Sequence, residues 1–252
     1  MILQVAILTF VYMTIIFVVA HFLEDNSIVD VFWGPGFVVI AAFTLMEAPG
    51  WDVRKWVVSF LVFLWGVRLA FHILMRNRKK GEDFRYRQWR QTWKHFVIRS
   101  FFQIFLLQGL FMLIISAPIW FINSMPNAPL TVLDNIGLIL FGVGFFFEVI
   151  GDMQLTVFKK DPANKGKIIT TGLWSMTRHP NYFGEALIWL GLSFYAFSLP
   201  LGWITLISPV TITVLLRFVS GVPMLEKKYR DHPDWPEYAR KTAPFVPFVR
   251  FL

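Results

Sequence analysis

Long apolar segments alternate with short polar ones along the whole chain, and this alternation predicts seven transmembrane helices. A membrane-spanning helix needs roughly 20 apolar residues. The runs that approach this length cover residues 2–23, 31–46, 56–75, 96–122, 131–150, 183–199 and 201–219. In the second run, WGPG (residues 33–36) predicts a helix break, because proline lacks an N–H and glycine permits unusual backbone angles. We therefore expect an all-α polytopic membrane protein that forms a single domain over residues 1–252.

Composition supports this class and excludes several kinds of site. Of the 252 residues, 56% are hydrophobic and only 16% are charged, whereas a soluble domain carries about a quarter charged residues. Cysteine is absent, which excludes thiolate nucleophiles and disulfides. The histidines lack the spacing of a zinc motif, so we expect no metal site. No Walker, GxGxxG or GxSxG pattern occurs, which excludes a hydrolase with a nucleophile elbow and a soluble dinucleotide-binding fold.

The basic residues are concentrated in segments that follow every second predicted span. These segments are residues 76–95, 151–182 and the tail 221–252. Lysine and arginine mark cytoplasmic loops, so we expect the N-terminus outside and the C-terminus in the cytoplasm. This topological use accounts for the net charge of +8 without a nucleic-acid partner.

Several ionisable residues fall inside the predicted spans, where charge is costly and by default marks function. Arg68 and His72 lie four residues apart, and Glu148 and Arg217 lie in later spans. We expect all of them in the cytoplasmic half, with Glu185 beside them. Structural ion pairs, such as Arg68–Glu148, and side chains that extend to the interface are the alternative.

The densest chemistry lies in TGLWSMTRHPNYFGE (residues 171–185), between two apolar runs. Pro180 disfavours the α conformation for the residue before it. The segment therefore predicts a turn that presents Arg178, His179, Asn181 and Glu185 to a polar ligand with several charged groups.

A second cluster, GEDFRY (residues 81–86), follows the third span. A tyrosine among cations is a reasonable proton donor to a developing enolate, because positive charge eases its ionisation. Tyr86 is therefore a candidate acid. An interfacial loop of basic and aromatic anchors is the alternative.

These motifs together resemble a known superfamily. TGLWSMTRHPNYFGE, LLRF (residues 215–218) and EKKYRDHPDWPEYARKTAPFVPF (residues 226–248) are similar to the steroid 5α-reductase C-terminal superfamily. WGPGF, WGVRLAFH and RKKGEDFRYRQWR resemble its bacterial branch, known only as a domain of unknown function. The resemblance implies NADPH-dependent reduction of a carbon–carbon double bond in a lipophilic enone, in a bacterial inner membrane, with a site open to the cytoplasm. Sterol reductases and isoprenylcysteine carboxyl methyltransferases have similar turns.

The resemblance also implies roles for individual residues. It places Asp152 and Lys159 at cofactor phosphates and ribose, and Asn181 and Glu185 at the nicotinamide. Arg178 is the first candidate for the 2′-phosphate, with Lys159 or Lys165 next. The cofactor-binding set is completed by residues at comparable positions, namely His179, Tyr182, Arg217 and Tyr238.

The chain departs from the steroid enzymes at two points. It lacks their early Gln-Glu pair, for which Asp30 and Tyr86 are the nearest equivalents, and Thr156 replaces an arginine. The catalytic candidates are thus Tyr86, Asp30 and Glu185. The substrate-binding candidates are Trp33, Arg68, His72 and Glu148.

Three functions follow in order of preference. The first is an NADPH-dependent reductase, whose partners are a lipophilic small molecule and membrane lipids. The second is an S-adenosylmethionine-dependent methyltransferase acting on a lipid or prenylated substrate. The third is a non-enzymatic lipid-binding membrane protein. The sequence leaves the oligomeric state open.

Overall fold

The computed structural model describes residues 1–78 and 81–249, and these residues form helices joined by short connections. Lys79, Lys80 and Arg250 of the basic segments lie outside the described residues. Within the described part there is no strand, only an isolated bridge between Thr177 and Ala243. The helices are α1 (Ile2–Phe22), α2 (Ile28–Met46), α3 (Val53–Asn77), α4 (Phe84–Thr92), α5 (Phe96–Ser100), η1 (Phe101–Leu106), α6 (Leu107–Ile115), α7 (Ala117–Ser124), α8 (Val132–Lys160), η2 (Pro162–Asn164), η3 (Gly172–Ser175), α9 (Pro180–Phe194), η4 (Gly202–Leu206), α10 (Ile207–Val214), η5 (Leu215–Val219), α11 (Val222–Tyr229) and α12 (Trp235–Lys241).

Six helical stretches among the described residues are long and apolar enough to cross a membrane, which makes this an integral membrane protein. They are α1, α2, α3, Phe96–Ile115, α8 and Gly202–Tyr229. The sequence predicts seven, and the difference is α9. At about 1.5 Å per residue its 15 residues extend about 22 Å, short of the ~30 Å hydrocarbon core. The orientation in the membrane stays a prediction.

The helices divide into two compact units, and the expectation of a single domain stays a prediction. Unit 1 comprises Met1–Leu130 with Ser198–Thr205, and unit 2 comprises Thr131–Phe197 with Leu206–Leu252.

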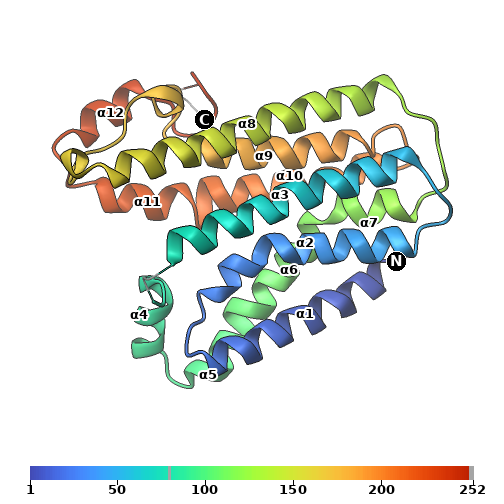
Figure 1. Ribbon diagram of the computed structural model, residues 1–252, viewed down its shortest axis with the longest axis horizontal. Helices are drawn as coiled ribbons and strands as arrows, with labels where there is room; N and C mark the ends of the chain where they lie inside the picture. Colours follow the sequence, from blue (N-terminus) through green and yellow to red (C-terminus); the bar gives the residue numbers. More distant parts are fainter. Residues whose placement is uncertain (79–80, 250–252) are drawn as a thin grey trace. The chain divides into compact units, whose positions relative to one another are not determined.

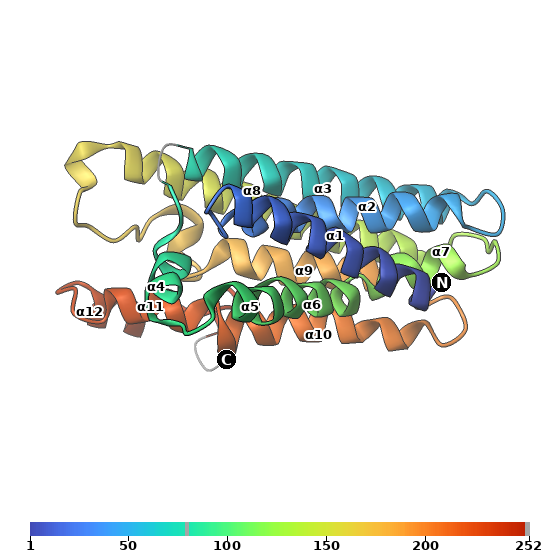
Figure 2. The same ribbon diagram turned by 90° about the horizontal axis from the view of Figure 1, so that it is seen from below.

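In unit 1, α2 and α3 lie side by side (Figures 1 and 2). The break predicted at residues 33–36 does not occur, because α2 continues through Pro35. The glycines serve close packing instead. A β-carbon at Gly34 would lie 2.4 Å from the carbonyl oxygen of Gly66, and one at Gly66 would lie 2.7 Å from the oxygen of Gly34. Small residues of this kind let membrane helices approach backbone to backbone.

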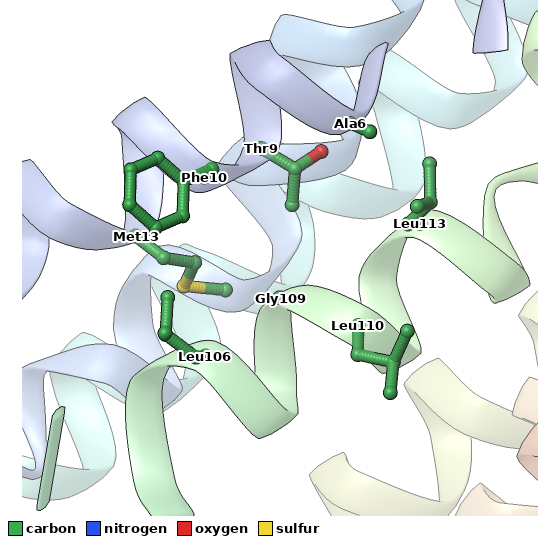
Figure 3. A pocket seen from close by; sticks show the side chains of 8 residues that line it. All are labelled: Ala6, Thr9, Phe10, Met13, Leu106, Gly109, Leu110 and Leu113. Carbon is green, nitrogen blue, oxygen red and sulfur yellow. The ribbon is translucent and has the colours of Figure 1, made fainter. Parts of the chain in front are cut away.

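The fourth predicted span is not one continuous helix. The helix from Phe96 continues through the π-helical η1 into α6, and α7 begins anew after Ser116 with Pro118 in its first turn. Beside it, α1 and the α6 region enclose an apolar pocket of about 190 Å³ lined by residues such as Met13 and Gly109 (Figure 3).

In unit 2, α8 is longer than predicted and carries two of the candidate residues on a helix instead of a loop. It starts with a capping box between Thr131 and Asp134 and continues ten residues beyond the predicted end at Ile150. Residues 151–160 contain no proline and only one glycine, so nothing in them stops a helix. Asp152 and Lys159 therefore lie on the final turns of α8.

The helices α8 and α9 run antiparallel side by side (Figures 1 and 2). Their contact is a glycine seam made of Gly137, Gly144 and Gly151 on α8 and of Gly184 and Gly191 on α9. A β-carbon at Gly191 would lie 2.7 Å from the oxygen of Gly137, and one at Gly184 would lie 2.5 Å from the oxygen of Gly144. Gly151 meets the ring of Pro180 in the same way, at 3.1 Å. This glycine seam fixes the first turn of α9 against α8 and so positions the candidate site.

Candidate functional site

The candidate site in unit 2 begins where α9 begins. His179 precedes Pro180 with φ −140° and ψ 64°, outside the α region as predicted. One residue into the helix, Nδ2 of Asn181 donates to Oδ1 of Asp152 at 3.0 Å. The amide oxygen of Asn181 is buried and has no hydrogen-bond partner among the described residues. The Asn181 side chain thus joins the two helices and keeps an acceptor unused.

Glu226 of α11 contacts the side chains of the two residues that precede α9. Its Oε1 accepts from Nε of Arg178 at 2.8 Å and lies 3.3 Å from Nε2 of His179. Nη1 of Arg178 donates to the carbonyl oxygens of Ala239 at 2.7 Å and Thr242 at 3.0 Å. With its side chain only 11% exposed, Arg178 is a buried cation that fastens the tail.

Further hydrogen bonds connect the tail to the turn. The hydroxyl of Tyr238 donates to the carbonyl oxygen of Trp174 at 2.7 Å, and the indole N–H of Trp174 donates to the carbonyl oxygen of Gly151 at 3.1 Å. Thr177 donates to the carbonyl oxygen of Phe245 at 2.8 Å. The tail is therefore an integral wall of the site.

These walls enclose a cavity of about 410 Å³, within the size range of small-molecule sites. Its lining is basic and aromatic, and no Asp or Glu occurs among the described residues that line it. The basic and aromatic lining residues are Lys159, Lys165, Lys167, Arg178, Lys228, His179, His232, Phe158, Trp174, Tyr229, Trp235 and Tyr238. Such a cavity suits an anionic ligand that also carries an aromatic ring.

The histidine in this wall is a neutral acceptor. Burial lowers the pKa of His179, and its hydrogen bond to the Glu226 carboxylate does not reverse this. With the ring proton on Nε2 facing Glu226, Nδ1 keeps its lone pair, and this buried atom has no partner among the described residues. The ring stacks on Tyr182 with centroids 5.4 Å apart. His179 therefore brings an unused buried acceptor to the wall of the cavity.

Of the predicted residues of unit 2, four line the cavity, whereas Glu148, Asp152, Asn181, Tyr182, Glu185 and Arg217 do not belong to its lining. Lys159, Arg178, His179 and Tyr238 line it. Glu148 lies buried on α8, one turn before Asp152. Glu185 lies one turn into α9. Arg217 lies on the π-helical η5 with its guanidinium 5.1 Å from the ring of Phe218.

The sequence interpretation missed several residues of this site. Glu226, Lys167, Lys228 and His232 were assigned no role, although they contact or surround the residues that were. One signal could have identified Glu226. An Arg-His pair next to a membrane helix needs a carboxylate partner when it is buried.

In unit 1, two catalytic candidates come together although 56 residues separate them. The hydroxyl of Tyr86 donates to Oδ1 of Asp30 at 2.7 Å, and Nη2 of Arg85 lies 2.9 Å from Oδ2 of the same carboxylate. Arg85 also contacts Asp83, the cap of α4, at 2.9 Å. The first turn of α2 and the start of α4 are thus joined around one carboxylate.

The phenol is not acidified as the sequence suggested. Tyr86 is only 3% exposed, and burial together with Asp30 raises its pKa well above the ordinary value. The nearby cation Arg85 lowers the pKa by less than these two effects raise it. Tyr86 is therefore a protonated hydrogen-bond donor at neutral pH.

The substrate-binding candidates of unit 1 lie on α2 and α3. Trp33 packs edge to face on Phe37, with centroids 5.3 Å apart. Arg68 and His72 are half-buried, one turn apart on α3. Their predicted convergence with Glu148 and Glu185, which belong to unit 2, stays a prediction.

Fold and site define an integral membrane protein of helices with a basic, aromatic-lined cavity, and sequence comparison gives its family. Residues 16–242 match a family described as a protein of unknown function, DUF1295. The chain belongs to this family of steroid 5α-reductase-like proteins.

Three curated proteins are similar to parts of the chain. An uncharacterized protein of Schizosaccharomyces pombe is 27% identical over 76% of this chain and 63% of its own length. The probable O-methyltransferase ustE of Ustilaginoidea virens is 52% identical over 18% of this chain and 16% of its own. The steroid 5-alpha-reductase DET2 of Arabidopsis thaliana is 36% identical over 25% of this chain and 24% of its own. The chain thus spans less than two thirds of each relative. No solved structure matches it.

Proposed function

We propose that this protein is a membrane-embedded NADPH-dependent reductase of a carbon–carbon double bond in a lipophilic substrate. The observation that carries the proposal is the cavity of unit 2, where five lysine and arginine side chains and no carboxylate occur among the described lining residues. Similarity to the steroid 5-alpha-reductase DET2 over part of the chain agrees with it.

The lining residues fit the groups that NADPH carries. Its pyrophosphate and 2′-phosphate match the ammonium groups of Lys159, Lys165 and Lys228, since cations bind phosphate through charge-assisted hydrogen bonds. Trp174 and Trp235 offer aromatic faces to an adenine ring. The unpartnered Nδ1 of His179 would accept from a ribose hydroxyl. When bound, this cofactor supplies a hydride.

Asn181 and Glu185 are proposed to orient the nicotinamide end, as the family resemblance implies. The amide of Asn181 is well suited, because Asp152 fixes its Nδ2 and leaves the oxygen available. A side chain held in this way loses little conformational freedom when a ligand binds.

The Tyr86–Asp30 pair is the proposed proton donor. Transfer of the Tyr86 hydroxyl proton to the substrate would leave a phenolate beside the Asp30 carboxylate. Arg85 lies 2.9 Å from Asp30 and would stabilise that charge. This is the arrangement expected of an acid that protonates a carbonyl oxygen or its adjacent carbon.

Methyl transfer is the second candidate, and the 52% identity to the probable O-methyltransferase over a short segment favours it. Its cofactor S-adenosylmethionine carries a sulfonium and no phosphate. Five cations and no carboxylate in the described lining would repel the sulfonium. The electrostatics of the cavity therefore favour the reductase.

Binding of NADPH, NADH and S-adenosylmethionine to the purified protein, followed by tryptophan fluorescence, tests the proposal. We expect saturable NADPH binding that is lost when Asn181→Ala and Glu185→Gln are combined. A matched control combines Asn135→Ala with Glu237→Gln, the same two replacements at exposed positions. Binding of S-adenosylmethionine alone would establish methyl transfer instead. If none of the three binds, the non-enzymatic lipid-binding alternative replaces the reductase.

A further inference from the structure

Two walls of the unit 2 cavity, far apart in sequence, are joined by a short hydrogen bond. His232, between α11 and α12, places Nε2 2.6 Å from the carbonyl oxygen of Gly166 in the segment after α8. Lys165 and Lys167 flank that glycine, and all four residues line the cavity. The contact therefore holds a lysine-bearing loop against the tail.

The direction of this hydrogen bond follows from the other ring nitrogen. The backbone N–H of Asp234 donates to Nδ1 of His232 at 3.2 Å, so Nδ1 must carry a lone pair. The ring proton is then on Nε2 and is donated to Gly166. One imidazole thus both stabilises the turn that precedes α12 and binds the loop.

The loop is shaped for this contact. Gly166 has φ +81°, a backbone angle that L side chains rarely adopt. A β-carbon there would meet nothing within 4 Å, so the glycine is required by the backbone angle and not by space. At the start of the loop, Nδ2 of Asn164 donates to the carbonyl oxygen of Phe158 at 3.2 Å and anchors it to α8.

We propose that His232 is a positioning residue, which holds Lys165 and Lys167 at the cavity so that their ammonium groups bind the phosphates of the cofactor. This role rests on the proposed NADPH binding. The lysines are exposed, long and flexible, and a loop held at both ends gives them a defined position before the ligand arrives. Without the hydrogen bond, each binding event must order the loop first.

Two replacements of His232 separate its two hydrogen bonds. In His232→Asn the side-chain oxygen takes the place of Nδ1, which keeps the bond from Asp234 and loses the one to Gly166. In His232→Gln the amide nitrogen takes the place of Nε2, which keeps the bond to Gly166 and loses the one from Asp234. A role in folding alone would affect both variants, whereas the positioning role predicts that glutamine rescues.

The first readout needs no ligand. Trypsin cleavage after Lys165 and Lys167, followed by mass spectrometry, reports how firmly the loop is held. We expect cleavage at these two sites to be about five- to tenfold faster in His232→Asn than in the wild type, the equivalent of one hydrogen bond. His232→Gln should match the wild type. Equal rates in all three proteins would overturn the proposal.

The second readout is the Kd for NADPH, which we expect to rise about five- to tenfold in His232→Asn and to stay near the wild-type value in His232→Gln. If the wild type binds NADPH and both variants bind it equally well, the positioning role is wrong and the proposed function stands. If the wild type does not bind NADPH, both are wrong.

Discussion

Asn181, in the first turn of α9, forms a 3.0 Å hydrogen bond with Asp152, which lies about two turns before the end of α8. The contact exists because Gly151, the residue before Asp152, leaves space for Pro180, the residue before Asn181. The close packing of α8 against α9 therefore also sets the geometry of the candidate site. A substitution in the glycine seam should disturb that site.

Replacing Gly184 by alanine tests this link. Its β-carbon would lie 2.5 Å from the oxygen of Gly144 and 2.6 Å from the backbone nitrogen of Glu148, so the helices must separate. We expect a loss of about 1–3 kcal/mol in the free energy of unfolding, measured by thermal denaturation in detergent, together with weaker NADPH binding. Gly142→Ala is the control, since its β-carbon meets nothing within 4 Å. An equally stable Gly184→Ala would contradict the role of the seam.

Arg178 and Lys165 should respond differently to alanine replacement. Arg178→Ala removes the donor to two carbonyl groups of the tail and leaves Glu226 with His179 alone. We expect a loss of about 3 kcal/mol in stability and an equal loss of NADPH and NADH binding. The distinction between the two cofactors then passes to the lysines.

Lys165→Ala should weaken NADPH binding roughly fivefold more than NADH binding, because only NADPH carries the 2′-phosphate. Titration of both cofactors against the purified variant measures this. Lys160→Ala removes an equal charge from an exposed position outside the cavity lining and serves as the control. Parallel losses for the two cofactors in Lys165→Ala would assign the 2′-phosphate to another residue.

Tyr86→Phe separates the proposed acid from its structural contact. The variant loses the hydrogen bond to Asp30, while Arg85 remains 2.9 Å from that carboxylate. We expect about 1–2 kcal/mol less stability and loss of reductase turnover with NADPH binding retained.

Tyr12→Phe is the matched control for Tyr86→Phe. It removes a 2.7 Å hydrogen bond from another tyrosine to the carbonyl oxygen of Phe32, on the same helix as Asp30. It should cost similar stability and retain turnover. If Tyr86→Phe also retains turnover, the proton comes from elsewhere.

The sequence predicted the membrane class and the turn before α9, but not how segments use their glycines. Gly34 and Gly36 beside Pro35 suggested a break, whereas Gly34 serves a backbone contact with Gly66. A missing side chain permits both uses, and only the partner helix distinguishes them. The end of α8 was predicted too early, because polar residues that follow an apolar run can still continue the helix.

A single sequence does not show which residues far apart along the chain come into contact. Asp30 and Tyr86 were each selected as alternatives for one role, and the fold joins them in a hydrogen bond. Glu226 was passed over because nothing near it in sequence needs a carboxylate. Its partners Arg178 and His179 lie 48 and 47 residues away along the chain.

The stability of the protein should depend on pH through His179. Burial lowers the pKa of this residue below its ordinary value of about 6.5. The folded protein therefore keeps the ring neutral at a pH where the unfolded chain already binds a proton, and stability rises with pH across that window. The contribution is fully present above about pH 6.5 and is lost as the pH falls through the lowered pKa of the folded state.

His179→Gln should flatten this dependence. We expect the thermal midpoint of the wild type to fall between pH 7 and pH 5 by more than that of the variant, because glutamine keeps an N–H for Glu226 and binds no proton. His21→Gln, at an exposed position on α1, should behave like the wild type. If the wild type and His179→Gln lose stability in parallel, another group carries the acid sensitivity.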